Sequence, residues 1–194
     1  MADAVLDYYL ELFHRLPLLR DGICWTVVSP LHDRVAAGDV AARLAGDRSA
    51  ALTPLPFDAA YDHDDRRILH LRQVGDAVAV LEVNGGFTAL TPVLERLSAG
   101  ARVHTAHWNI NSNSTMAYAE DGAVRVKFEA LFPDQRSGTD PGALDDHLAP
   151  LLEALRPPRT SFRPVLLSIV EHRTGVRLTP DWFTEDIPAL SLPA

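Results

Sequence analysis

The segment over residues 101–140 constrains the fold more than any other part of this sequence. It holds three strand-like stretches, a tight turn and a loop rich in turn residues, in unbroken succession. Parallel strands need crossover connections of a dozen residues or more, and the spaces between these stretches are shorter than that. The segment therefore predicts consecutive antiparallel strands and disfavours a doubly wound nucleotide-binding fold.

The tight turn in this segment predicts a β-hairpin. The Asp-Gly pair at 121–122 is typical of a two-residue hairpin loop. Such a loop would pair Ala119 with Val124 and, two residues further out, Ala117 with Val126. We therefore expect Val124 and Val126 together on the core side of the sheet.

Hydrophobic periodicity predicts the remaining elements. Apolar residues at three- and four-residue spacing indicate helices, and short runs rich in β-branched residues indicate strands. By these patterns we expect helices over 4–16, 39–44, 91–100, 140–155 and 163–174. We expect further strands over 22–30, 67–73 and 76–83. Residues 48–65 show no sustained period and are predicted to form a loop. The pattern predicts an α+β fold with a mostly antiparallel sheet of five to six strands, flanking helices and a helical C-terminal segment.

The length of 194 residues suits a single globular domain over 1–194. Within it, residues 1–20 would form the N-terminal helix and residues 140–194 the helical C-terminal segment. The chain is 47% hydrophobic and 23% charged, values that are typical of soluble globular proteins.

Charge and cysteine content limit the partners and the compartment. The net charge of −8 disfavours nucleic acid, and the apolar runs are far shorter than the roughly 20 residues of a membrane span. The acidic N-terminus is unlike a secretory signal, and the single Cys24 excludes an internal disulfide, so we expect a cytoplasmic protein. Lys127 is the only lysine, an arginine bias that fits a high-GC genome.

The densest cluster of polar and aromatic residues contains His104, His107, Trp108 and Asn109. His104 and His107 stand three residues apart, so in a strand they face opposite sides and cannot share a metal ion. His104 is either a hydrogen-bonded core histidine or a general base in a pocket floored by Trp108. Asn109 is expected to serve a turn.

Other motifs give no cofactor or metal site. Residues 62–65 combine aspartate and histidine but lack the spacing of a calcium loop or a zincin helix, so they are typical of a solvated loop. Gly85 and Gly86 precede a helix without a phosphate-binding signature and are explained by a strand-to-helix turn. We therefore expect no cofactor and no metal.

The first functional hypothesis is a non-catalytic protein-binding or regulatory module. Its motivation is a well-specified fold without a convergent acid, base and nucleophile. The protein partner would be recognised at the sheet edge or at the loop over residues 134–140, where Arg136 pairs with Asp134 or Asp140 or faces outward as an anchor. Trp182 and the segment 187–192 would supply an apolar anchor.

Two alternatives stay open. In the first, a small cofactor-independent enzyme gathers His104, Trp108, Glu82 and His70 in a pocket floored by the sheet, with the histidine as acid or base and a small molecule as ligand. Glu82 interrupts an apolar run and is either a buried acid or a solvent-facing residue at the strand edge. In the second, an immunity-type protein neutralises a basic partner with its acidic surface.

Several phrases resemble a family of uncharacterised actinobacterial proteins of about this length. They are CWTVV from Cys24, LERLSAG from Leu94, AEDGAVRVKFEALFPDQRSGTDP from Ala119 and TGVRLTP from Thr174. The resemblance covers most of residues 22–183 and implies a domain of unknown function. It transfers no activity, cofactor or catalytic residue.

Overall fold

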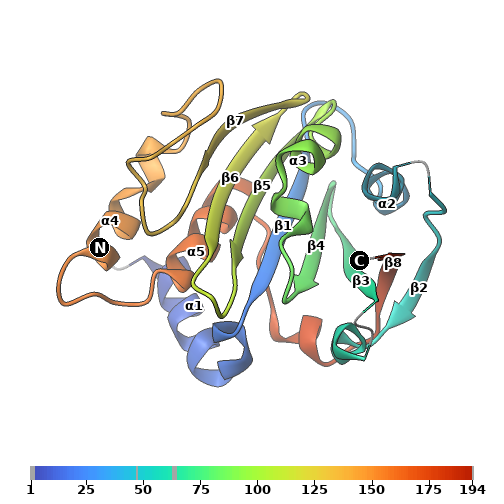
Figure 1. The fold of residues 1–194 in the computed structure, drawn as a ribbon, viewed down its shortest axis with the longest axis horizontal. Coiled ribbons are helices and arrows are strands. Elements are labelled where there is room, and N and C mark those ends of the chain that lie inside the picture. Colours follow the sequence, from blue (N-terminus) through green and yellow to red (C-terminus); the bar gives the residue numbers. More distant parts are fainter. Residues whose placement is uncertain (1–2, 47, 63–64, 194) are drawn as a thin grey trace.

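An eight-stranded antiparallel sheet forms the centre of the protein in the computed structural model, which describes residues 3–46, 48–62 and 65–193 (Figure 1). The strand order is β2-β8-β3-β4-β1-β5-β6-β7, and each neighbouring pair is antiparallel. The strands are β1 (Ile23–Pro30), β2 (Leu52–Leu55), β3 (Arg66–Val74), β4 (Ala77–Val83), β5 (Ala101–Trp108), β6 (Ser114–Glu120), β7 (Ala123–Phe128) and β8 (Ile187–Pro193). The expected α+β class and antiparallel sheet are confirmed, but the expected five to six strands are wrong because the sheet has eight.

In the described part of the chain five α-helices flank the sheet, and short 3-10 turns connect several elements. The helices are α1 (Ala4–Arg15), α2 (Ala37–Ala45), α3 (Thr91–Leu97), α4 (Ala149–Leu155) and α5 (Arg163–Thr174); the 3-10 turns are η1 (Pro17–Arg20), η2 (Phe57–Tyr61), η3 (Phe87–Ala89), η4 (Asp145–His147) and η5 (Pro180–Phe183). None of the helices in the described ranges is both long and apolar enough to cross a bilayer.

Local signals set the ends of the two longest helices. The Asp3 carboxylate accepts hydrogen bonds from the backbone N–H groups of Val5 (3.0 Å) and Leu6 (3.3 Å), which satisfies donors at the start of α1. Gly175 ends α5 in the left-handed conformation with φ of 70°. Both ends agree with the sequence prediction.

The C-terminal segment is not wholly helical, which corrects the prediction for residues 140–194. α4 begins only at Ala149, and β8 lies in the sheet between β2 and β3. β8 carries Pro188 and Pro193, and β2, within the stretch predicted to be a loop, carries Pro54. Proline removes a ladder donor and lowers strand propensity, so these two strands depend on pairing between segments far apart in the sequence.

The predicted hairpin has a β-bulge that shifts its register. Ala119 pairs with Val124 as expected, but Ala117 pairs with Lys127 rather than with Val126. One extra residue on β7 reverses the alternation of side chains, since a bulge places two residues opposite one. Val124 and Val126 consequently join different hydrophobic clusters.

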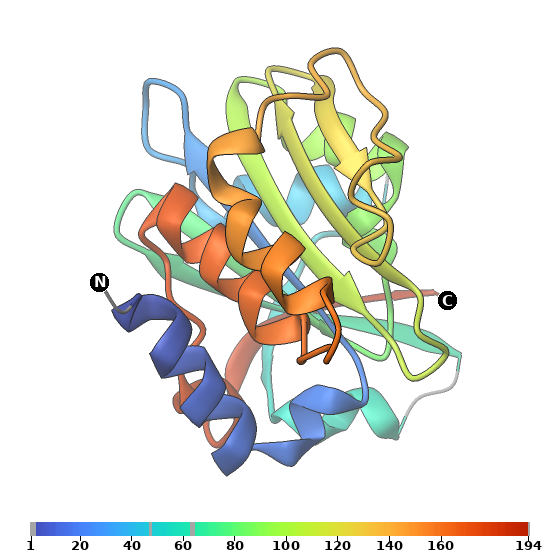
Figure 2. The same cartoon turned by 90° about the vertical axis from the view of Figure 1, so that its left-hand side faces the viewer.

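Helices cover both faces of the sheet (Figures 1 and 2). α1, α4 and α5 lie over one face, here called the α5 face, and α2 and α3 lie over the other, here called the α3 face. The core under α5 contains Trp25, Trp108 and Trp182, which are all at most 2% exposed. The core under α3 is built from valine, leucine and alanine.

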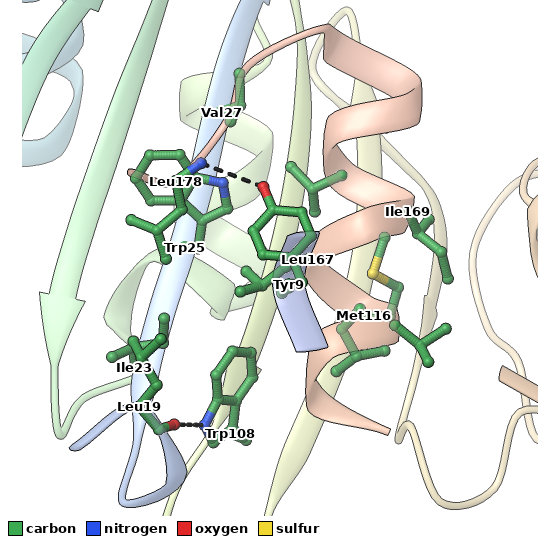
Figure 3. Packing of buried hydrophobic residues seen from close by; sticks show 14 of the residues in the cluster. Tyr9, Leu19, Ile23, Trp25, Val27, Trp108, Met116, Leu167, Ile169 and Leu178 are labelled. Carbon is green, nitrogen blue, oxygen red and sulfur yellow. Dashed lines mark hydrogen bonds between the residues drawn. The ribbon is translucent and has the colours of Figure 1, made fainter. Parts of the chain in front are cut away.

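Polar groups of the α5 core are joined to the backbone (Figure 3). The indole N–H of Trp108 donates to the carbonyl of Leu19 at 2.7 Å, and the hydroxyl of Tyr9 accepts from the N–H of Leu178 at 3.2 Å. Because a buried polar group without a partner is costly, these bonds fix the positions of large side chains.

Candidate functional site

The structure separates the residues that the enzyme hypothesis placed in one pocket. In the pairing of β1, Val27 is opposite His104, whereas Cys24 is opposite both Glu82 and His107. Side chains alternate along a strand, so His104 lies on the α5 face, and Glu82 lies with His107 on the α3 face. The predicted convergence of His104 with Glu82 is therefore wrong, because the sheet lies between them.

His104 is a core residue. It is 1% exposed, its ring stacks on Tyr118 with centroids 4.5 Å apart, and its Nε2 accepts a hydrogen bond from Arg173 Nε at 3.3 Å. Burial lowers the pKa of His104 to about 3, and the guanidinium of Arg173 acts in the same direction. The imidazole is therefore neutral at physiological pH and beyond direct contact with solvent.

The other predicted pocket residues on this face are also buried. Trp108 is fully buried against Phe13, with ring centroids 5.8 Å apart. His70 is 1% exposed, and its Nε2 lies 3.1 Å from the carbonyl oxygen of Pro56. Burial lowers the pKa of His70. These side chains fill the core and line no open site.

Trp182 is not the surface anchor that the sequence predicted. It is 2% exposed and packs edge-on against Trp25 with centroids 5.0 Å apart, while the guanidinium of Arg72 lies 4.9 Å from its ring centroid. The predicted anchor segment 187–192 falls within β8, in the interior of the sheet. Both belong to the core because the C-terminal segment returns to pair with β3.

Asn109 and Arg136 hold loops in place. Asn109 Oδ1 accepts from the backbone N–H groups of Asn111 and Asn113, which confirms its expected role in a turn. Arg136 donates to a carboxylate oxygen of Asp145 and to the carbonyl of Pro141 at 3.2 Å. The predicted partners of Arg136, Asp134 and Asp140, were therefore wrong.

Glu82 is a buried acid on the α3 face. It is 1% exposed, its Oε1 lies 3.3 Å from Arg67 Nε, and its Oε2 accepts from the backbone N–H of Thr88 at 3.3 Å. Burial raises the pKa of Glu82 to about 7, and the hydrogen bond from Thr88 and the charge of Arg67 oppose that rise. The carboxylate anchors η3 to the C-terminal end of β4.

The two glycines before η3 make this anchoring possible. A Cβ on Gly85 would overlap the carboxylate of Glu82, and a Cβ on Gly86 would lie 2.9 Å from Nε2 of His107. The chain therefore passes closer to these two side chains than any larger residue allows. Their role is geometric, as the sequence interpretation had it.

Buried hydroxyl groups continue from η3 across the sheet. Thr26 Oγ1 donates to Thr88 Oγ1 at 2.9 Å and lies 3.0 Å from Thr105 Oγ1, while Cys24 Sγ lies 3.0 Å from Thr88 Oγ1. Burial raises the pKa of the Cys24 thiol, with the Glu82 carboxylate adding to the effect. The thiol is therefore protonated and unreactive, and this network is a support for η3.

Beyond η3 the α3 face opens into a groove around Lys127. Lys127 Nζ donates to the carbonyl of Ala89 at 2.8 Å and to Thr91 Oγ1 at 3.4 Å. Burial lowers the pKa of Lys127. We call this the Lys127 groove; its volume is about 460 Å³, and its lining includes Thr91, Ser114, Thr115, Lys127, Glu129 and Ser137.

The loop over 134–140 forms one wall of the groove and closes the edge of β7. Ser137 and Lys127 exchange backbone hydrogen bonds at 2.8 and 3.0 Å, and Asp140 N donates to the carbonyl of Arg125 at 2.7 Å. The edge of β7 is thus occupied by the chain itself, which leaves the groove as the open part of this region.

His107 lies beneath the groove. It is 9% exposed and pairs across the strands with Thr115. Burial lowers the pKa of His107; the charge of Lys127 lowers it further and that of Glu129 raises it. The imidazole is consequently held neutral below a groove that contains charges of both signs.

The groove was not predicted from the sequence. Its one sequence signal is that Lys127 stands alone among arginines. Its carbonyl and hydroxyl partners, Ala89 and Thr91, lie 38 and 36 residues away along the chain. Among the described residues no group of three or more histidine, cysteine, aspartate or glutamate side chains is placed to hold a metal ion; His63 and Asp64 of the aspartate-rich run lie outside the described residues.

Comparison with known proteins identifies the family. The model of DUF6461, a family of unknown function, matches residues 6–186. The chain belongs to DUF6461. No curated protein and no solved structure matches it. The resemblance to an uncharacterised family of about this length is confirmed, and the actinobacterial origin stays a prediction. Because the family is one of unknown function, membership in it assigns no ligand to this groove.

Proposed function

We propose that this protein is a non-catalytic binding module that takes the anionic group of a ligand, a carboxylate, into the Lys127 groove. The observation that carries the proposal is a single ammonium group set among hydroxyl groups in an open, concave part of the α3 face. The volume of the groove lies within the range of small-ligand sites, and its lining is polar apart from Phe128.

The rigidity of the groove supports binding. Lys127 is held by Ala89 and Thr91, and the η3 turn that carries Ala89 is itself anchored by Glu82. An ammonium group held in place loses less conformational entropy when a ligand binds. A hydrogen bond between charged groups is stronger than one between neutral groups, so Lys127 would supply the largest polar contribution.

The arrangement of acids and bases favours binding over catalysis. The two side chains chosen for acid–base chemistry, His104 and Glu82, are each 1% exposed and lie on opposite faces of the sheet. A general base must come within hydrogen-bond reach of the proton that it removes. Neither side chain meets that requirement for a ligand in the Lys127 groove or for one outside the protein.

In this proposal the loop over 134–140 takes part in recognition, as the sequence analysis expected. Ser137 contributes to the lining of the groove, and the same loop occupies the edge of β7. Recognition through this loop would therefore use side chains in the groove, and would not add a strand to the sheet.

The test compares binding of simple carboxylates to the wild type and to Lys127 variants by titration calorimetry. Acetate, propionate and succinate are the probes. Because Glu129 also lines the groove, we expect weak binding of acetate and propionate to the wild type and weaker binding of the dianion succinate, retention in Lys127→Arg, which keeps the charge, and loss in Lys127→Met. The control is Arg34→Met, which removes an exposed cation outside the groove. Equal binding by the wild type and Lys127→Met would contradict the proposal.

A further inference from the structure

The Lys127 groove contains two opposite charges that do not neutralise each other. Lys127 and Glu129 both line it. Within the described part of the chain neither has an oppositely charged group within 4.0 Å. Lys127 lies in β7, and Glu129 directly follows the last residue of that strand, Phe128.

Each charge is fixed by the protein and retains bonding capacity. Lys127 uses two of the three hydrogens of its ammonium group, on Ala89 and Thr91. Glu129 accepts the backbone N–H of Ser114 at 2.9 Å and the hydroxyl of Ser114, both at Oε1. The hydrogen bonds found among the described residues leave Oε2 of Glu129 without a donor.

We infer that the Lys127 groove binds a zwitterion of the α-amino-acid class, with the ligand carboxylate on Lys127 and the ligand ammonium on Glu129. The inference rests on the proposed function and names its ligand class. In an α-amino acid the carboxylate and the ammonium group are a few ångströms apart, and Lys127 and Glu129 line the same groove without an ion pair between them, which suits a ligand that carries both groups. Thr91 Oγ1 accepts from Lys127 and retains its own proton, which suits the carboxylate of such a ligand.

The charge distribution favours a zwitterion over a plain anion. Glu129 repels a carboxylate that lacks a positive group, and Glu95 lines the space that adjoins the groove along Thr91 and Lys127. The whole chain carries a net charge of −8, which further weakens binding of multiply charged anions. A ligand with no net charge avoids both penalties and still satisfies both side chains.

The experiment measures binding of the twenty standard L-amino acids to the full chain by titration calorimetry. The best binder is then compared with its N-acetyl derivative, which lacks the ammonium group, and with its amide, which lacks the carboxylate. On the wild type we expect each derivative to bind about tenfold or more weakly, since each loses one hydrogen bond between charged groups.

Variants assign the two ends of the ligand. In Glu129→Gln the preference for the free amine over the N-acetyl derivative should disappear, and in Lys127→Met the preference for the carboxylate over the amide should disappear. The derivatives test the wild type directly, so the inference stays falsifiable even if a variant fails to fold.

The failures of the two proposals are distinguishable. Equal binding of the N-acetyl derivative and the free amino acid would overturn the zwitterion and leave carboxylate binding at Lys127 standing. Binding of acetate or succinate with none of the twenty amino acids binding would do the same. Absence of binding by every carboxylate tested would overturn both.

Discussion

The two faces of the sheet differ in the kind of side chain that they bury. On the α5 face, three tryptophans are packed at no more than 2% exposure, and the two histidines considered for catalysis, His70 and His104, are each 1% exposed. On the α3 face, small apolar residues alternate with buried polar ones, among them Glu82, Thr26 and Thr105. The comparison shows that the buried tryptophans lie on one face of the sheet and the buried network of polar side chains lies on the other.

The largest effect is expected on the α5 face. Trp182→Ala should lower the free energy of unfolding by about 3–5 kcal/mol, because it leaves a cavity beside Trp25. Denaturant unfolding measures this change. Phe132→Ala removes an aromatic side chain that is 56% exposed and should change the free energy of unfolding by less than about 0.5 kcal/mol. Similar costs for the two variants would contradict the assignment of Trp182 to the core.

The next effect concerns the charge buried on the α3 face. Since the pKa of Glu82 is raised to about 7, the folded protein binds a proton more tightly than the unfolded chain does. The contribution of Glu82 to stability is therefore fully present below its ordinary value of 4.5 and is lost as pH rises toward 7, by at most about 3 kcal/mol.

The measurement is the difference in unfolding free energy between Glu82→Gln and the wild type. Burial lowers the pKa of His70, His104 and His107, so these groups change stability with pH in the opposite sense. A difference between two proteins cancels their contribution. We expect Glu82→Gln to gain stability relative to the wild type as pH rises from 4.5 to 7, whereas Glu153→Gln, at an exposed site, should show no such trend.

A smaller loss of stability is expected where the backbone at Gly85 passes close to the Glu82 carboxylate. Gly85→Ala should cost about 1–3 kcal/mol, because the added methyl group overlaps the Glu82 carboxylate and forces η3 to shift. Gly38→Ala is the matched control, since Gly38 lies in α2 with no atom near its missing Cβ. That control should be stabilised by up to about 1 kcal/mol. If Gly85→Ala stabilised the protein as much as Gly38→Ala, the close contact between Gly85 and the Glu82 carboxylate would be contradicted.

The smallest effect on stability is expected in the Lys127 groove. Lys127→Met should lower the free energy of unfolding by about 1 kcal/mol or less, because it removes one strong hydrogen bond to Ala89 at a half-buried site. Its effect on carboxylate binding should be much larger than this. A variant that loses both stability and binding in proportion would assign Lys127 to the fold instead of to a site.

Elements marked by local chemistry were predictable from the sequence. Asp3 caps α1, Gly175 ends α5, and the Asp-Gly turn at 121–122 joins β6 to β7. Each signal acts within a few residues, so the sequence contains all that is needed. β8 was not predictable in the same way, because its pairing with β3 joins segments more than 100 residues apart and its prolines weaken its own propensity.

The site was predictable only in part, for a related reason. Alternation within β5 correctly predicts that His104 and His107 face opposite sides. The relation between His104 and Glu82 depends on the register of two strands on either side of β1, and no local pattern encodes it. Likewise, the position of the Lys127 ammonium group depends on its hydrogen bonds to Ala89 and Thr91, which are close to it only in the folded chain.

The two edge strands of the sheet, β7 and β2, affect whether folded copies of the protein associate with one another. At one end, residues 137–140 occupy the hydrogen-bonding groups of β7; at the other, β2 has only four residues and Pro54 removes one of its donors. An exposed strand edge is a template on which a second chain can add and start a fibre. Both ends of this eight-stranded sheet are blunted, so concentrated solutions of the folded protein are protected against growth by strand addition.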